Sequence, residues 1–215
     1  MPNHATRHCN ILLYADHTVL FSSGTDIATI EKKINDEMNL VDSWLRDNSL
    51  FLNAGKTESM LFGTCANLKN VNYFNIHVNG CTINRVSEFK YLGVTFDENV
   101  NWNAHVKYVI TKAGKRIGML SRIRNNITVY CANIIYTSFI RPIFDYCDNI
   151  YHCCGEVNSQ SLEKMQGRAA RVVCKSYDSD TAMISLKWGT LIRRLEHHIL
   201  VLSKSVSVVV ADNFM

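Results

Sequence analysis

Two segments of the chain carry rows of basic residues whose spacing suits contact with phosphate groups. Residues 103–126 contain six lysines and arginines and no acidic residue. On a helical wheel, five of these six share one half of the circle, and apolar residues occupy the other half. Like charges on one helical face repel each other, and the phosphates of a nucleic acid would neutralise that repulsion. This first row consists of Lys107, Lys112, Lys115, Arg116 and Arg122.

A second basic row follows later in the chain. Lys164, Arg168, Arg171 and Lys175 succeed one another at steps of four, three and four residues. Such steps place side chains on one face of a helix. We interpret both rows as nucleic-acid-binding surfaces. The alternative is that each row is an ordinary solvated helical face without a ligand.

A candidate catalytic feature is the polar segment at residues 14–17, with the sequence Tyr-Ala-Asp-His. It separates the apolar runs 11–13 and 19–21, a pattern typical of two strands joined by a tight turn. We therefore expect Asp16 at the tip of a hairpin. Its carboxylate could serve as a metal ligand, but an isolated carboxylate holds Mg²⁺ weakly. The alternative is a polar turn residue without a metal.

The cysteines do not predict a metal site. The chain has eight cysteines and no Cys-x-x-Cys pair. His152 lies close to Cys147, Cys153 and Cys154, but their spacing matches no zinc-finger pattern. We predict structural or incidental thiols that stay reduced, in a protein of the nucleus or cytoplasm.

Neither end of the sequence predicts secretion or a membrane span. The first ten residues are polar and lack the apolar centre of a secretory signal. The apolar stretch 199–211 is too short to cross a bilayer, and Lys204 interrupts it. Hydrophobic residues make up 47% of the chain and charged residues 20%, which predicts an ordinary globular protein. The net charge of +4 is too small to indicate a ligand by itself.

The first 100 residues mix strand and helix patterns. After possible helix caps at 23–26, apolar residues recur every three or four positions from Ile27 to Leu45, which predicts an amphipathic helix covering a sheet. Residues 50–52 and 59–62 resemble strand pieces, and 74–83 resemble a hairpin with a type I′ turn at Asn79–Gly80. Residues 89–94 predict a further strand.

From about residue 102 the patterns become helical. We predict helices at 103–124, 129–141, 158–175 and 190–205 and a domain boundary near residue 100, so that the domains are 1–100 and 101–215. The expected fold class is therefore α+β. A partial antiparallel sheet with one covering helix is followed by an all-helical bundle.

Four motifs, in this order, resemble the reverse transcriptases of non-LTR (LINE-type) retrotransposons. The Tyr-Ala-Asp-His segment at 14–17 resembles the Tyr-Ala-Asp-Asp motif of the polymerase palm. Leu-Asn-Ala-Gly-Lys-Thr at 52–57 and Phe-Lys-Tyr-Leu-Gly-Val at 89–94 resemble two later palm segments. Arg141-Pro142, Asp145-Tyr146 and the segment 162–171 resemble the helical region beyond the palm. The resemblance covers nearly the whole chain and implies a palm in 1–100 and a thumb-like region in 101–215.

The resemblance also implies roles for individual residues. Asp16 would be a catalytic metal ligand for Mg²⁺, and Lys56 would lie near the incoming nucleotide, where it could protonate or neutralise the leaving pyrophosphate. Tyr91, Leu92 and Gly93 would position the primer end. The implied partners are an RNA template and a DNA primer. The alternatives are a solvated turn lysine at position 56 and a packed core strand at 91–93.

Two departures from the family pattern speak against catalysis. His17 replaces the second aspartate of the motif, and a nitrogen ligand suits Mg²⁺ poorly. Only 15 residues precede Asp16, so we expect the partner aspartate of an earlier strand to be absent unless an upstream retrotransposon segment supplies fingers and palm. Three interpretations remain: a truncated, inactive reverse transcriptase domain, a non-catalytic nucleic-acid-binding module, and a decayed remnant without selected function.

Overall fold

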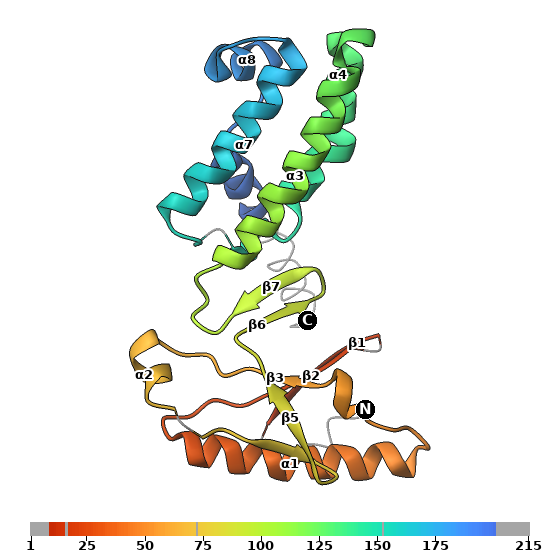
Figure 1. Cartoon of the computed structure of the whole chain (residues 1–215), viewed down its shortest axis with the longest axis vertical. Coiled ribbons are helices and arrows are strands. Elements are labelled where there is room, and N and C mark those ends of the chain that lie inside the picture. The colour runs from red at the N-terminus through yellow and green to blue at the C-terminus, as the bar shows by residue number, and fades with distance from the viewer. Residues whose placement is uncertain (1–8, 16, 72, 152, 201–215) are drawn as a thin grey trace, which may run out of the picture. The chain divides into compact units, whose positions relative to one another are not determined.

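The computed structural model describes residues 9–200 except 16, 72 and 152 (Figure 1). The chain divides into two compact units. The N-terminal unit comprises the residues up to Lys90 together with Asp97–Val100, and the C-terminal unit comprises Tyr91–Phe96 and the residues from Asn101 onward. Helices and small sheets occur together, which confirms the α+β class. The assignment of palm and thumb to the two halves stays a prediction.

The predicted hairpin around residues 14–17 is present. Strands β1 (Asn10–Tyr14) and β2 (His17–Phe21) are antiparallel, with Asn10 opposite Phe21 and Tyr14 opposite His17. Asp16 itself lies outside the described residues.

Helix α1 (Ile27–Asp47) forms where the apolar period predicts it. Its N-cap is Asp26, whose carboxylate accepts the backbone N–H of Thr29 at 2.8 Å. The apolar face of α1 packs on the hairpin of β4 (Ile76–Val78) and β5 (Cys81–Arg85) (Figure 1). Met38, Phe74, Ile76, Val78 and Ile83 are the buried centre of this core.

The turn between β4 and β5 is tied to α1. Asn79 and Gly80 have φ of 51° and 75°, as a type I′ turn requires, so the predicted turn is confirmed. The Asn79 amide donates a hydrogen bond to Asp42 Oδ1 at 2.7 Å, and Arg46 Nε contacts Asp42 Oδ2, also at 2.7 Å. The Asp42 carboxylate therefore joins helix and turn.

The rest of the N-terminal sheet differs from the prediction. Residues 50–52 are not a strand, and β3 is only Glu58–Ser59, parallel to β5. The 3₁₀ turn η1 (Ala54–Lys56) precedes β3 and folds the chain back, because Lys56 N–H bonds to Asn53 O. A short helix, α2 (Cys65–Lys69), follows. The described strands thus form three small sheets, and not one antiparallel sheet.

The predicted single strand at 89–94 is wrong. Leu92 and Gly93 have φ of 44° and 85°, and they form a turn between β6 (Glu88–Tyr91) and β7 (Val94–Asp97). The Tyr146 hydroxyl donates to the Leu92 carbonyl at 2.6 Å. A Cβ at position 93 would lie 3.2 Å from the Tyr146 ring, so the tyrosine covers the turn at close range.

The described residues of the C-terminal unit form helices joined by short loops, together with part of the hairpin of β6 and β7. Its helices are α3 (Asn103–Ile123), α4 (Val129–Ile135), α5 (Arg141–Asp145), α6 (Asp148–Tyr151), α7 (Glu156–Cys174) and α8 (Ser179–Leu186), and residues 191–200 are also helical. Short turns are η2 (Arg124–Asn126) and the π-helical η3 (Tyr136–Ile140). No helix among the described residues is long and apolar enough to span a membrane.

Helix α3 packs along α7 (Figure 1). Ala113, Ile117 and Ala169 are completely buried in this core. Burial of a side chain such as Ile117 contributes about 2 kcal/mol to folding. The predicted helix 129–141 is interrupted by η3, because Pro142 lacks an N–H for the regular helical bond. Helix α8 was not predicted.

We predict that Asp42→Asn lowers the free energy of unfolding by about 1–2 kcal/mol, because it removes the charge that Arg46 and Asn79 contact. Burial alone would raise the pKa of the Asp42 carboxyl, but the hydrogen bonds from Arg46 and Asn79 hold it below its ordinary 3.8. A carboxyl with a lowered pKa stabilises the fold above its unfolded-state pKa and loses this contribution as pH falls through the folded-state value. The check is urea unfolding at pH 7 and below pH 4. The free energy of unfolding should decrease less between these two pH values for the variant than for the unmodified chain.

Asp36→Asn is the matched control, because Asp36 is exposed on the same helix. Its unfolding free energy at pH 7 should stay within about 0.5 kcal/mol of the parent. Equal effects of the two substitutions would contradict the role given to Asp42.

We predict that Gly93→Ala destabilises the chain by about 1–3 kcal/mol, because a Cβ there meets both a positive φ and the Tyr146 ring. Gly80→Ala separates the two causes: Gly80 has a φ of +75°, but nothing lies within 4 Å of its added Cβ. Denaturant unfolding should show a larger loss at position 93 than at position 80. A larger loss at position 80 would refute the close contact with Tyr146.

Candidate nucleic-acid interface

The basic row of α3 lies on the surface that the helix turns away from its core. Lys107, Lys112, Lys115 and Arg122 are exposed, whereas the opposite face is buried. Helix α3 contains no acidic residue, so this surface has charge of one sign only. From Lys107 to Arg122, a distance of 15 residue steps, the row extends about 22 Å at 1.5 Å per residue.

Two members of the α3 row also make contacts within the fold. The Arg116 guanidinium lies 3.9 Å from the centre of the Phe139 ring and donates a hydrogen bond to the Phe139 carbonyl. The Lys112 ammonium is 5.4 Å from the Tyr108 ring, a looser cation–π contact on an exposed surface. Arg116 therefore stabilises the join between α3 and η3, and its predicted part in binding stays a prediction.

The basic row of α7 is narrower. Lys164, Arg168, Arg171 and Lys175 are all exposed, and they fall within about 60° of one another on the wheel. This stripe lies opposite the buried face of α7. Lys175 has a φ of 54° and ends the helix, with its backbone N–H bonded to Val172 O. The row extends about 16 Å along the helix axis.

The acidic residues of α7 do not neutralise its basic row. Glu163 points to another partner, because its Oε1 accepts the backbone N–H groups of Leu191 at 2.7 Å and Ile192 at 3.3 Å. Glu156 accepts a hydrogen bond from the Gln160 amide at 3.0 Å. Both carboxylates lie on faces of the helix other than the stripe.

Arg124, which belongs to neither basic row, has a structural role. Arg124, in η2, is buried, and its guanidinium donates to the carbonyls of Val173 at 2.9 Å and Ile127 at 2.7 Å. It thereby joins the end of α3 to the end of α7. The two basic rows thus stand on helices that are held by core packing and by a buried arginine.

The residues with implied catalytic roles are placed as follows. Lys56 is exposed at the end of η1 in the N-terminal unit. Tyr91, Leu92 and Gly93 are partly buried at the turn that Tyr146 covers. Sequence reasoning missed this turn, and only the glycine at position 93 could have indicated it. His17 is exposed at the start of β2.

The metal-binding prediction rests on chemistry alone. The described residues contain no group of three or more His, Cys, Asp or Glu side chains placed to hold a metal ion. Asp16 is not among those residues. At the motif itself the donor set is one carboxylate followed by an imidazole, which is not the oxygen-rich set that Mg²⁺ requires. All eight cysteines carry free thiols.

The chain is similar in sequence to polymerases of mobile elements. It is 21% identical over 168 residues to "RNA-directed DNA polymerase from mobile element jockey" of Drosophila melanogaster, which covers 75% of this chain and 18% of that protein. It is 23% identical over 184 residues to "Probable RNA-directed DNA polymerase from transposon BS" of the same species, which covers 82% of this chain and 20% of that protein. The jockey protein of Drosophila funebris matches at 21% identity over 76% of this chain.

The chain spans about a fifth of the length of these curated relatives. No family model matches it, and no solved structure matches it. The chain resembles the reverse transcriptases of non-LTR retrotransposons over at least three quarters of its length, as the order of its motifs predicts.

Proposed function

We propose that the chain is a reverse-transcriptase-derived segment that binds nucleic acid through the basic rows of α3 and α7 and has little or no polymerase activity of its own. In the parent enzyme the ligand would be an RNA template paired with a DNA primer. The observation that carries the proposal is the pair of exposed rows, each without an acidic neighbour on its face.

The geometry of the rows supports contact with a phosphodiester backbone. At about 3.4 Å per nucleotide of a duplex strand, a 16 Å row reaches along roughly five nucleotides. Lysine and arginine heads on exposed helical faces can approach phosphates without a groove, so this binding would depend little on base sequence. The similarity to RNA-directed DNA polymerases supports a nucleic acid as the ligand.

The motif chemistry supports a chain without activity of its own. Nucleotide addition by a two-metal mechanism needs several carboxylate oxygens around Mg²⁺. His17 replaces one carboxylate at the motif. We therefore infer that Mg²⁺ belongs to the parent reaction and is not held firmly here. A location in the nucleus or cytoplasm stays a prediction.

We predict that the purified chain binds a fluorescent RNA–DNA hybrid in low salt and that its affinity falls steeply as salt rises. Lys112→Ala with Lys115→Ala should weaken binding about tenfold and reduce the slope of log affinity against log salt by about one to two. The triple change Lys164→Ala, Arg168→Ala and Arg171→Ala should act likewise. Fluorescence anisotropy measures both quantities.

Lys32→Ala with Lys69→Ala is the matched control, because both lysines are exposed in the N-terminal unit and lie outside the rows. It should leave the salt slope unchanged. The proposed interface is wrong if the unmodified chain does not bind the RNA–DNA hybrid at low salt. It is also wrong if the control substitutions weaken binding as much as the substitutions in the rows. A chain that also aggregates and lacks cooperative unfolding would favour the decayed remnant.

We predict that the chain incorporates deoxynucleotides no faster than a protein-free blank in primer extension with Mg²⁺, because the motif has one carboxylate where the family has two. A reverse transcriptase of known activity on the same template and primer serves as the positive control. Robust template-dependent incorporation by this chain without substitutions would overturn the inference of inactivity and leave the binding proposal intact.

A further inference from the structure

The C-terminal unit contains a pocket whose lining is almost entirely basic. Its volume is about 360 Å³. Six of its seven lining residues have basic side chains, and none is acidic. The lining consists of Arg141, Lys187, Gly189, Arg193, Arg194, His197 and His198. None of these residues belongs to the basic rows of α3 and α7.

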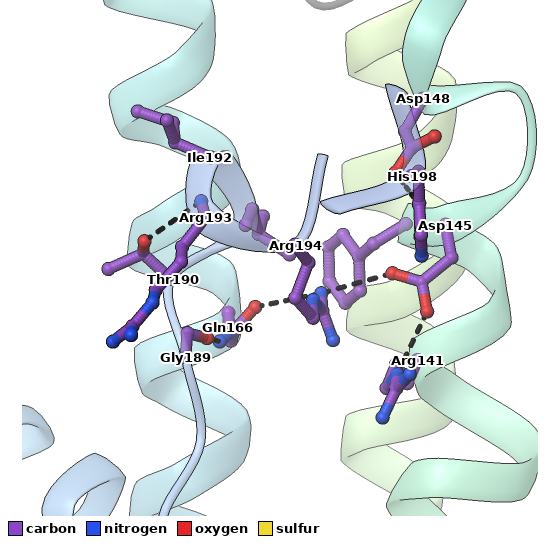
Figure 2. Close-up of polar contacts among 12 residues, drawn as sticks. Arg141, Asp145, Asp148, Gln166, Gly189, Thr190, Ile192, Arg193, Arg194 and His198 are labelled. Carbon is purple, nitrogen blue, oxygen red and sulfur yellow. Dashed lines mark hydrogen bonds and ion pairs between the residues drawn. The ribbon is translucent and has the colours of Figure 1, made fainter. Parts of the chain in front are cut away.

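Two of the arginines share one carboxylate. Asp145 Oδ2 contacts Arg141 Nε at 2.9 Å, and Asp145 Oδ1 contacts Arg194 Nη2 at 3.2 Å (Figure 2). A single negative charge therefore faces two guanidinium groups. One carboxylate can offset only one of the two guanidinium charges, so positive charge remains in excess at this part of the pocket wall.

A buried glutamine holds the wall in place. Gln166 of α7 is completely buried; its amide donates to the Gly189 carbonyl at 2.8 Å and its Oε1 accepts from Arg194 Nη2 at 3.1 Å (Figure 2). Glu163 caps the helix that carries the pocket residues 193–198 through Leu191 N–H. Arg194 and Gly189 are thus positioned before any ligand arrives, which reduces the entropy lost on binding.

Two further cations of the pocket have no acidic partner among the residues that the structure describes. Lys187 and Arg193 are exposed, and no ion pair joins either of them to a carboxylate of the described residues. His198 differs, because its Nδ1 lies 2.7 Å from Asp148 Oδ2. Lys187 and Arg193 therefore supply charge that no ion pair within residues 9–200, apart from the gaps at 16, 72 and 152, neutralises.

We propose that this pocket binds a phosphate group. A guanidinium offers paired N–H donors that match two phosphate oxygens, and a lysine adds a point charge. Arg193 and Lys187 supply the direct contacts, and the anchored Arg141 and Arg194 keep the wall positive. The further step, that the phosphate belongs to a nucleic-acid strand, rests on the proposed function. A free phosphate compound would be recognised by the same chemistry.

The first experiment uses pyrophosphate as the probe with the full chain. At about tenfold excess over its dissociation constant, pyrophosphate should raise Tm by roughly 5 °C, at an ionic strength held constant with chloride. Lys187→Ala with Arg193→Ala should abolish the rise. Both side chains are exposed, so the variant should keep the parent's circular dichroism and its Tm without ligand. Lys32→Ala with Lys69→Ala should retain the full shift.

The second experiment identifies the source of the phosphate. Binding of the RNA–DNA hybrid should weaken about tenfold in the pocket variant, with a salt slope smaller by about one. If pyrophosphate binding is lost while hybrid affinity is unchanged, the phosphate site stands and its ligand is a free phosphate compound. If the unmodified chain binds pyrophosphate but does not bind the RNA–DNA hybrid, the proposed function is wrong and the phosphate site in the pocket still stands.

The phosphate site is overturned by either of two results. One is a parent chain whose Tm does not respond to pyrophosphate. The other is an equal response in the parent and the pocket variant, which would place the ligand elsewhere. Arg194 is left unchanged in these tests, because its contacts with Gln166 and Asp145 make a folding defect the expected result of its removal.

Discussion

The close packing of α3 against α7 is the constraint on which the C-terminal unit depends. Ala113 on α3 and Ala169 on α7 are completely buried in the same core, and side chains this small allow two helices to approach closely. A helix that buries one face must expose the other. Because the basic rows lie on the exposed faces, the same contact that forms the core also orients the charges. A larger residue at Ala113 would disturb both at once.

Buried polar residues set the geometry that apolar packing leaves open. Gln166 is inaccessible to solvent, yet its amide bonds to Gly189 and its oxygen to Arg194. A buried amide without partners would cost free energy, so the loop and helix that follow α8 are held where those partners lie. Trp188, in the loop that follows α8, stacks on Tyr136 with 3.7 Å between the ring centres. Burial raises the pKa of Tyr136 to about 12, so its hydroxyl stays neutral in this core.

Local patterns predicted the elements whose signals lie close together in the sequence. The apolar period of α1, the Asn79–Gly80 turn and the helices α3 and α7 needed no distant partner for their recognition. The errors arose where distant contacts decide. Leu92 is an unlikely residue for a positive φ, and its turn depends on Tyr146, 54 residues away. The parallel pairing of β3 with β5 depends on where η1 directs the chain.

The basic surfaces also divide into those that the sequence could predict and those that it could not. The basic rows are helical repeats and could be recognised from spacing. The basic pocket combines α5 with residues 187–198 through Asp145 and Gln166, and no local pattern contains that combination. Assembly in three dimensions was needed to bring Arg141 near Arg194.

The distribution of charge explains why the chain's average conceals its chemistry. The whole chain has a formal charge of +4, but residues 101–200 contain 14 basic and seven acidic residues, so they carry +7 and the remainder −3. Several of the seven carboxylates are committed to internal partners: Asp145 to two arginines, Asp148 to His198 and Glu163 to a helix end. The other four carboxylates, those of Glu156, Asp178, Asp180 and Glu196, are exposed, and no ion pair joins them to a basic residue of the described part of the chain. The excess of positive charge within residues 101–200, which the average of the whole chain conceals, is the condition that phosphate binding requires.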